Sequence, residues 1–242
     1  MVNIGIDARL VDGKGGGTKI YTTILIKHLL KYDRSNMYYL YTYAHHPVLS
    51  SEVKGINNVQ IRETNNKLVW RTPMIYSLML KDGIDIIHFP AYNVAPRFLL
   101  KRPKIVVTFH GIDVEYFKKK QRHLYWKINC RLSARMSDKI IAVSKTLKKE
   151  ISYFYRVPES KIITIYYGFL DEKLSKEKID HIAKKYGINE DDILLLCVDG
   201  NEPRKNIVTF IKSIKILLDK YNFDKIKVII TRSSYYSDVV KT

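Results

Sequence analysis

Short apolar runs alternate with longer segments of helical periodicity along most of this 242-residue chain. Runs at residues 2–6, 84–89 and 104–109 predict strands, and the largely apolar 84–89 run is typical of a strand covered on both faces. Segments at 19–32 and 145–155 predict amphipathic helices. This alternation is typical of βαβ units, so we expect an α/β fold with a Rossmann-like, doubly wound parallel sheet.

The pattern restarts near residue 170. A charged helical segment at 176–186 precedes an apolar run at 192–198, which begins a new βαβ unit. We expect a first Rossmann-like domain over residues 1–170 and a truncated second Rossmann-like domain over residues 171–242. A single βαβ unit cannot bury both faces of its sheet, so we expect this second part to pack on the first domain, on another chain or on further polypeptide.

The longest predicted helix covers residues 114–136 and is strongly basic. The apolar positions that we expect to face inward are Phe117, Leu124, Ile128 and Leu132. Residues 97–149 hold 15 Lys and Arg against 3 acidic residues, within a net charge of +18 for the chain. Such a field attracts nucleic acid, an anionic membrane surface or a phosphorylated ligand.

Several classes of protein are disfavoured by what the sequence lacks. No helix-turn-helix, RNA-binding or zinc motif appears, so nucleic acid is the weakest of these partners. No apolar run approaches the roughly 20 residues that span a bilayer. Cys130 and Cys197 are far apart, without disulfide or metal-ligand spacing, and predict buried thiols in a reducing compartment. We therefore expect a cytoplasmic protein without a bound metal.

Four segments follow predicted strands and begin helices, where open parallel sheets bind ligands. They contain Gly16-Gly17-Thr18, His110, Ser144 and Glu202-Pro203-Arg204-Lys205-Asn206. Glycines let a backbone approach a ligand, and helix N-terminal amides favour phosphate. Gly16-Gly17-Thr18 has neither the dinucleotide nor the Walker spacing, and an ordinary turn explains it equally well.

The other three segments also allow two interpretations each. Arg204 and Lys205 at a helix N-terminus suit a diphosphate, although a solvated basic turn has the same sequence. His110 either faces a ligand cleft, where it can donate a hydrogen bond or bind an anion when protonated, or is structural. Ser144 is most simply interpreted as a helix N-cap.

Taken together and in this order, these segments resemble the family-4 retaining glycosyltransferases of the GT-B fold. The matching stretches are Gly16-Gly17-Thr18 with Tyr21, Asp85–Pro90, Val107–His110, Ser137–Ser144, Val157–Ile162 with Gly168, and Glu202–Asn206. The resemblance implies transfer of a sugar from a nucleoside-diphosphate donor to an acceptor hydroxyl. It also implies retained anomeric configuration, no metal and no separate cofactor.

The resemblance also implies roles for individual residues. Arg204 and Lys205 would stabilise the departing diphosphate, with His110 beside the transferred sugar. The residues expected to contact the donor are Gly16, Gly17, Thr18, Ser144, Glu202 and Asn206. The acceptor would be a glycan or a lipid-linked molecule, and the basic helix would contact an anionic membrane through Lys118–Lys120, Arg122, Lys127, Arg131 and Arg135.

The sequence departs from the family pattern at several positions. Asp199 replaces a glycine, Tyr167 replaces an asparagine before Gly168, and the acidic E-x7-E segment has no counterpart before Thr242. Two functions remain ahead of nucleic-acid binding through the basic residues, which is the least favoured of three. The chain is either a glycosyltransferase or part of one, or it is a binding module that is completed by a second chain or a homo-oligomer.

Overall fold

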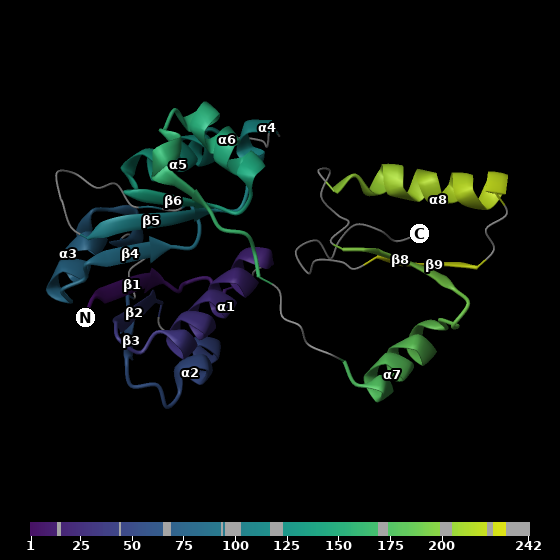
Figure 1. The fold of residues 1–242 in the computed structure, drawn as a ribbon, viewed down its shortest axis with the longest axis horizontal. Coiled ribbons are helices and arrows are strands. Elements are labelled where there is room, and N and C mark those ends of the chain that lie inside the picture. The colour runs from purple at the N-terminus through teal and green to yellow at the C-terminus, as the bar shows by residue number, and fades with distance from the viewer. Residues whose placement is uncertain are drawn as a thin grey trace. The chain divides into compact units, whose positions relative to one another are not determined.

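The chain divides into two units, Met1–Gly168 and Phe169–Thr242, in the computed structural model (Figure 1). The described residues are 1–13, 16–43, 45–64, 69–92, 94, 103–116, 123–168, 174–198, 205–221 and 225–230. The predicted boundary between residues 170 and 171 lies outside them. Each unit is considered by itself.

Among the described residues, the first unit contains a seven-stranded sheet in the order β3-β2-β1-β4-β5-β6-β7, with every neighbouring pair parallel. The strands are β1 (Asn3–Asp7), β2 (Met37–Thr42), β3 (Val59–Glu63), β4 (Ile86–Phe89), β5 (Lys104–Phe109), β6 (Lys139–Ala142) and β7 (Ile162–Thr164). This confirms the predicted Rossmann-like, doubly wound sheet. The strand order reverses between β1 and β4, which is where such sheets bind ligands.

Helices cover both faces of this sheet (Figure 1). They are α1 (Gly17–Tyr32), α2 (Pro47–Val53), α3 (Met74–Lys81), α4 (Asp113–Tyr116), α5 (His123–Met136) and α6 (Lys145–Tyr155), with 3-10 turns at Val69–Arg71 and Glu159–Lys161. One buried cluster joins Met79, Cys130 and Ile151 from α3, α5 and α6 to the strands. A second cluster joins Ile26 and Leu49 from α1 and α2 to the strands. Burial on both faces explains why the strands are largely apolar.

The predicted orientation of the basic helix is wrong. Leu124, Ile128 and Leu132 are 67%, 50% and 38% exposed, while Phe117 lies outside the described residues. Helix α5 instead buries the small side chains of Cys130 and Ala134, together with Ser133. Small residues let the helix backbone approach the sheet closely, which leaves the bulky apolar side chains on the opposite side.

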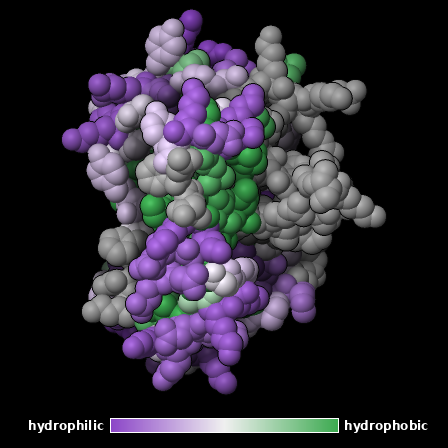
Figure 2. Space-filling view, turned by 90° about the vertical axis from the view of Figure 1, so that its right-hand side faces the viewer, coloured by the Kyte–Doolittle hydropathy of each residue, from purple (hydrophilic) through white to green (hydrophobic). Residues whose placement is uncertain are grey.

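The second unit contains α7 (Lys176–Tyr186), β8 (Ile193–Cys197), α8 (Ile207–Tyr221) and β9 (Ile226–Ile230), with β8 and β9 parallel. Helix α7 ends at Gly187, whose φ of 61° is the left-handed conformation of a helix C-cap. Many apolar side chains of this unit are exposed, among them Leu194, Leu196, Val208, Ile211 and Ile230. Figure 2 shows apolar side chains gathered near the middle of the face that it draws.

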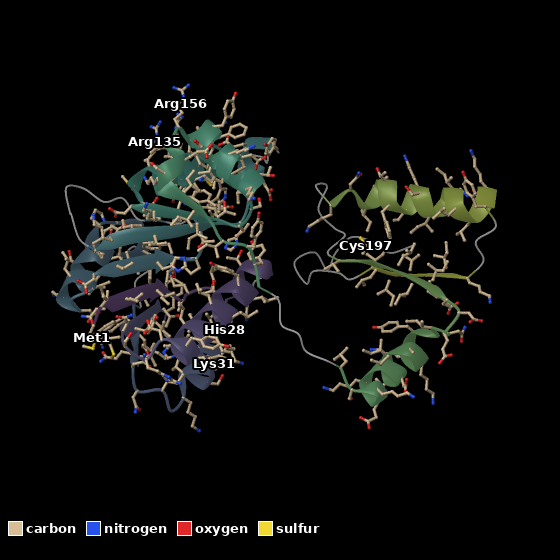
Figure 3. The ribbon with its side chains drawn as sticks, viewed as in Figure 1. Met1, His28, Lys31, Arg135, Arg156 and Cys197 are labelled. Atoms are coloured by element: carbon tan, nitrogen blue, oxygen red, sulfur yellow. The ribbon has the colours of Figure 1, made fainter. Side chains whose placement is uncertain are left out.

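The two cysteines differ in burial. Cys130 on α5 is fully buried, as predicted, whereas Cys197 on β8 is only half-buried (Figure 3). Both are free thiols. The expectation that both thiols would be buried is therefore wrong for Cys197, because the sheet of the second unit leaves much of its surface uncovered.

Candidate active site

The carboxyl ends of β1, β4 and β5 lie side by side in the first unit. Parallel pairing places Ile6 opposite His88 and Phe89 opposite Val107. The loop after β1 leads into α1, and His110 directly follows β5. The Tyr21 ring on α1 lies 4.8 Å from the His110 ring, edge to face. The structure therefore brings the start of α1 and His110 together.

The glycine segment forms the N-terminus of α1. Gly16 and Gly17 are exposed, and a Cβ built on either would meet nothing within 4 Å. The first amides of a helix have no intrahelical partner and carry partial positive charge. Gly16 provides no side-chain cap, and the first turn of α1 contains no acidic residue. Thr18 is half-buried one residue further along α1, and its carbonyl accepts a 2.8 Å hydrogen bond from the Thr22 hydroxyl. This end of α1 can accept an anion.

Both ring nitrogens of His110 are hydrogen-bonded. Nε2 lies 2.6 Å from the Pro90 carbonyl oxygen, and Nδ1 lies 2.6 Å from the Tyr167 hydroxyl. Burial lowers the pKa of His110, although the Pro90 carbonyl partly opposes this. The lowered pKa favours the neutral imidazole, in which Nε2 donates its proton to the Pro90 carbonyl.

His88 and Thr108 form a buried polar pair near Tyr21 and His110. His88 Nε2 is 2.8 Å from Thr108 Oγ1, which is also 3.2 Å from the Tyr21 hydroxyl. Burial lowers the pKa of His88 to about 4, with nearby His110 adding to the effect and Asp7 opposing it. A separate role for His88 could not be predicted, because the sequence of an apolar strand does not indicate which side chain of the next strand its histidine contacts.

His110 and Ser144 line one cavity of about 300 Å³. The full lining is His110, Gly111, Ile112, Asp113, Tyr116, Val143, Ser144, Thr146, Leu147 and Glu150. Ser144 caps α6 by accepting a 3.1 Å hydrogen bond from the Leu147 amide, which is the simpler of its two interpretations. Tyr116 donates a 2.7 Å hydrogen bond to Glu150. Glu150 was not among the predicted site residues, because only the pairing of β5 with β6 brings it to the same cavity as His110.

The cationic segment is described only in part. Glu202 and Arg204 lie outside the described residues, as does Asp199. Lys205 is exposed just before α8. Asn206 has a φ of 52°, and its side-chain oxygen accepts a 2.7 Å hydrogen bond from the Thr209 hydroxyl. The roles expected for these residues stay predictions.

On α5, Lys127 and Arg135 are exposed and Arg131 is half-buried, whereas Lys118–Lys120 and Arg122 lie outside the described residues. Arg135 and Arg156 point away from the body of this unit (Figure 3). In the described part of the chain, no helix is long and apolar enough to cross a membrane. The same part contains no cluster of three His, Cys, Asp or Glu side chains that could hold a metal ion.

The parallel sheet, with its glycine-led helix at the reversal of strand order, is the architecture of GT-B glycosyltransferases. Residues 15–172 match the model of Glycosyltransferase Family 4, and the chain belongs to this family. It is 32% identical over 117 residues to the O-antigen chain mannosyltransferase RfbU of Salmonella typhimurium, a stretch covering 48% of this chain and 30% of that protein. An uncharacterized glycosyltransferase of Methanocaldococcus jannaschii is 30% identical over 95 residues, covering 38% of this chain and 24% of that protein.

Two solved structures show the same fold. HepE from Anabaena in complex with UDP-glucose has a TM-score of 0.57 at 15% identity, covering 96% of this chain and 70% of that chain. A glycosyltransferase from Rickettsia africae has a TM-score of 0.55 at 18% identity, covering 96% and 68%. The aligned stretches thus span less than a third of the curated relatives and about two thirds of these structures.

Proposed function

We propose that this chain binds a nucleoside-diphosphate sugar and takes part in transferring the sugar, with retention, to an acceptor hydroxyl. The observation that carries the proposal is the exposed glycine N-terminus of α1, which Tyr21 joins to His110 at the reversal of strand order. Family membership supports sugar transfer. The UDP-glucose complex of HepE supports a nucleotide-sugar donor, and the mannosyltransferase name of RfbU supports sugar transfer. Retention rests on the family resemblance alone.

The chemistry of the first unit is suited to this reaction. As the sugar leaves its donor, negative charge builds on the diphosphate oxygens. Fixed backbone amides at a helix N-terminus stabilise that charge more strongly in the transition state than in the ground state. Gly16, Gly17 and Thr18 would supply these amides. No step in this scheme uses a metal or another cofactor.

The cavity beside His110 is suited to an acceptor rather than to the diphosphate. Its polar lining includes Ser144 and the carboxylates of Asp113 and Glu150. Carboxylates accept hydrogen bonds from hydroxyls and repel phosphate oxygens. We therefore place the hydroxyl-bearing group of a glycan or lipid-linked acceptor here.

A membrane surface is the second partner that we propose. The outer side of α5 exposes Leu124, Tyr125, Ile128 and Leu132 together with Arg135 and with Lys127, whose ammonium is paired with Glu115 at 2.7 Å. An amphipathic helix of this kind can lie at an anionic bilayer surface. Sedimentation with phosphatidylglycerol vesicles tests this: Ile128→Asp should release the protein, and Ile20→Asp, on exposed α1, should not. Equal sedimentation of both variants would reject the contact.

The test of donor binding is calorimetric titration of the chain with UDP-glucose and GDP-mannose. Gly17→Val adds a side chain in open space, so the fold should tolerate it while the ligand should not. The control is Lys176→Val, at the equivalent first position of α7. Binding of at least one donor by the unmodified chain and the control, lost in Gly17→Val, supports the proposal. If neither donor binds, or if Gly17→Val binds as well as the unmodified chain, the proposal fails.

The exposed apolar side chains of the second unit favour one alternative, in which this chain is a binding module completed by other polypeptide. Leu194 and Leu196 on β8 and Val208 on α8 are 46%, 59% and 60% exposed, and burying them requires further surface. A complementing chain or a second copy could supply it. Light scattering during gel filtration distinguishes these cases: a monomer that binds and transfers sugar by itself would exclude the alternative.

A further inference from the structure

Tyr167 and His110 form a close pair in the candidate active site. The Tyr167 hydroxyl lies 2.6 Å from His110 Nδ1. Their ring planes are only 7° apart, with centroids separated by 5.8 Å. The lone pair of an imidazole nitrogen lies in the plane of its ring, so nearly parallel planes suit a hydrogen bond between the two ring edges.

The second nitrogen of His110 fixes the direction of this hydrogen bond. Nε2 lies 2.6 Å from the Pro90 carbonyl oxygen, which can only accept. Neutral His110 therefore carries its proton on Nε2, and Nδ1 holds a lone pair. The Tyr167 hydroxyl must then be the donor to Nδ1.

Tyr21 packs against both members of the pair. Its ring meets His110 at 76° with centroids 4.8 Å apart, and meets Tyr167 at 70° with centroids 5.8 Å apart. The Tyr21 hydroxyl is itself 3.2 Å from Thr108 Oγ1. The imidazole is thus held by a hydrogen bond at each nitrogen and by an aromatic ring at its edge or face, which restricts its rotation.

We propose that Tyr167 is a positioning residue, which holds His110 in one tautomer and one orientation for sugar transfer. The proposal deepens the proposed function, because it rests on His110 taking part in that reaction. The only hydroxyl proton of Tyr167 is used by His110, while the phenol oxygen can still accept a hydrogen bond. The pair can therefore accept from a sugar hydroxyl, but it offers no proton to a phosphate oxygen.

Tyr167→Phe tests this proposal, because it removes one oxygen and keeps the ring contacts. Tyr166→Phe is the matched control, since Tyr166 is the neighbouring residue and is 61% exposed. The first measurement is the ¹⁵N NMR signal of His110 Nδ1 and the pKa of His110 in the 242-residue chain. Loss of a donor to the neutral ring should move the Nδ1 signal and raise this pKa by roughly 0.7 units.

Other titratable groups lie around His110, and both variants leave them in place. They are His88 on β4, Tyr21 on α1, and Asp113, Tyr116 and Glu150 around the cavity. The control should therefore show the signal and the pKa of the unmodified chain. An unchanged Nδ1 signal and pKa in Tyr167→Phe would overturn the proposal.

Kinetics supply the second measurement. Misplacement of His110 should lower kcat about fivefold in Tyr167→Phe and leave KM within about twofold. A changed NMR signal with unchanged kcat would make the contact merely structural and overturn the proposal. If the unmodified chain neither binds nor transfers any nucleotide sugar, the proposed function fails separately, and the NMR comparison still decides whether Tyr167 positions His110.

Discussion

Asp7→Asn should destabilise the first unit strongly, because Asp7 is the ion-pair partner of a buried guanidinium. Arg9 Nε and Nη2 donate to the two Asp7 oxygens at 2.8 and 2.6 Å. The side chains are only 11% and 7% exposed, and the Arg9 guanidinium lies 3.7 Å from the centre of the Trp70 ring. Burial opposes the charged form of Arg9, but the Asp7 carboxylate and the Tyr43 hydroxyl together outweigh it and raise the pKa of Arg9 above its ordinary value.

Removing one partner of a buried pair leaves the other charge without compensation, which typically costs about 3–5 kcal/mol. That is a large share of the roughly 5–15 kcal/mol by which folded domains are stable. With a urea m-value of about 2 kcal/mol/M, the unfolding midpoint should fall by about 2 M. Both tryptophans of the chain, Trp70 and Trp126, belong to the first unit, so their fluorescence reports its unfolding.

The control for Asp7→Asn is Glu52→Gln, which removes the carboxylate of a more exposed pair. Lys27 Nζ is 3.7 Å from Glu52, and the side chains are 63% and 27% exposed. Its loss should change the free energy of unfolding by less than about 1 kcal/mol. The reasoning is refuted if Asp7→Asn costs no more than this control.

Two further predictions concern pH and the second unit. The pKa of His88 is lowered to about 4 in the folded state. The unfolded state therefore binds more protons as the pH falls, and the free energy of unfolding should decrease by roughly 2 kcal/mol from pH 7 to pH 5. His88→Gln should weaken this pH dependence. If the urea midpoint of His88→Gln shifts between pH 7 and pH 5 as much as that of the unmodified chain, the lowered pKa of His88 is contradicted. Lys205→Ala should reduce donor affinity at least tenfold without changing the melting temperature. The control Lys212→Ala, on α8, should leave donor affinity unchanged. Equal donor affinities of the two variants in titration calorimetry would contradict a role for Lys205 in donor binding.

The sheet of this protein could be predicted because its strands are covered on both faces. Such strands are apolar almost throughout, and strands that alternate with helical segments are typical of a parallel sheet. The positions of Gly16, Gly17 and His110 at strand ends follow from the same pattern, since parallel strands present their carboxyl ends at one edge.

Side-chain partners were harder to predict than strands. The hydrophobicity of Leu124, Ile128 and Leu132 predicted that these side chains of α5 would be buried. The structure buries the smaller side chains of Cys130 and Ala134 instead, because they allow α5 to pack closely on the sheet. Helix α3 begins only after Pro73, since proline is tolerated at a helix start and not in its interior.

The contact between Tyr167 and His110 joins residues 57 positions apart. No periodicity or spacing reports such a contact, because it depends on where the chain leaves the last strand of the sheet. The sequence marked Tyr167 only as a departure from the family pattern, without a partner. The same limit applies to Glu150, which reaches the cavity through helix α6.

The central claim is that the start of α1 and the end of β5 form the donor site of the first unit. Amide NMR of the ¹⁵N-labelled chain during titration with UDP-glucose and GDP-mannose tests it most directly. We expect one donor to move the amide signals of Gly16, Gly17, Thr18 and His110 saturably, with little change across α2. Saturable shifts confined to other parts of the first unit, or no shifts with either donor, would contradict the claim.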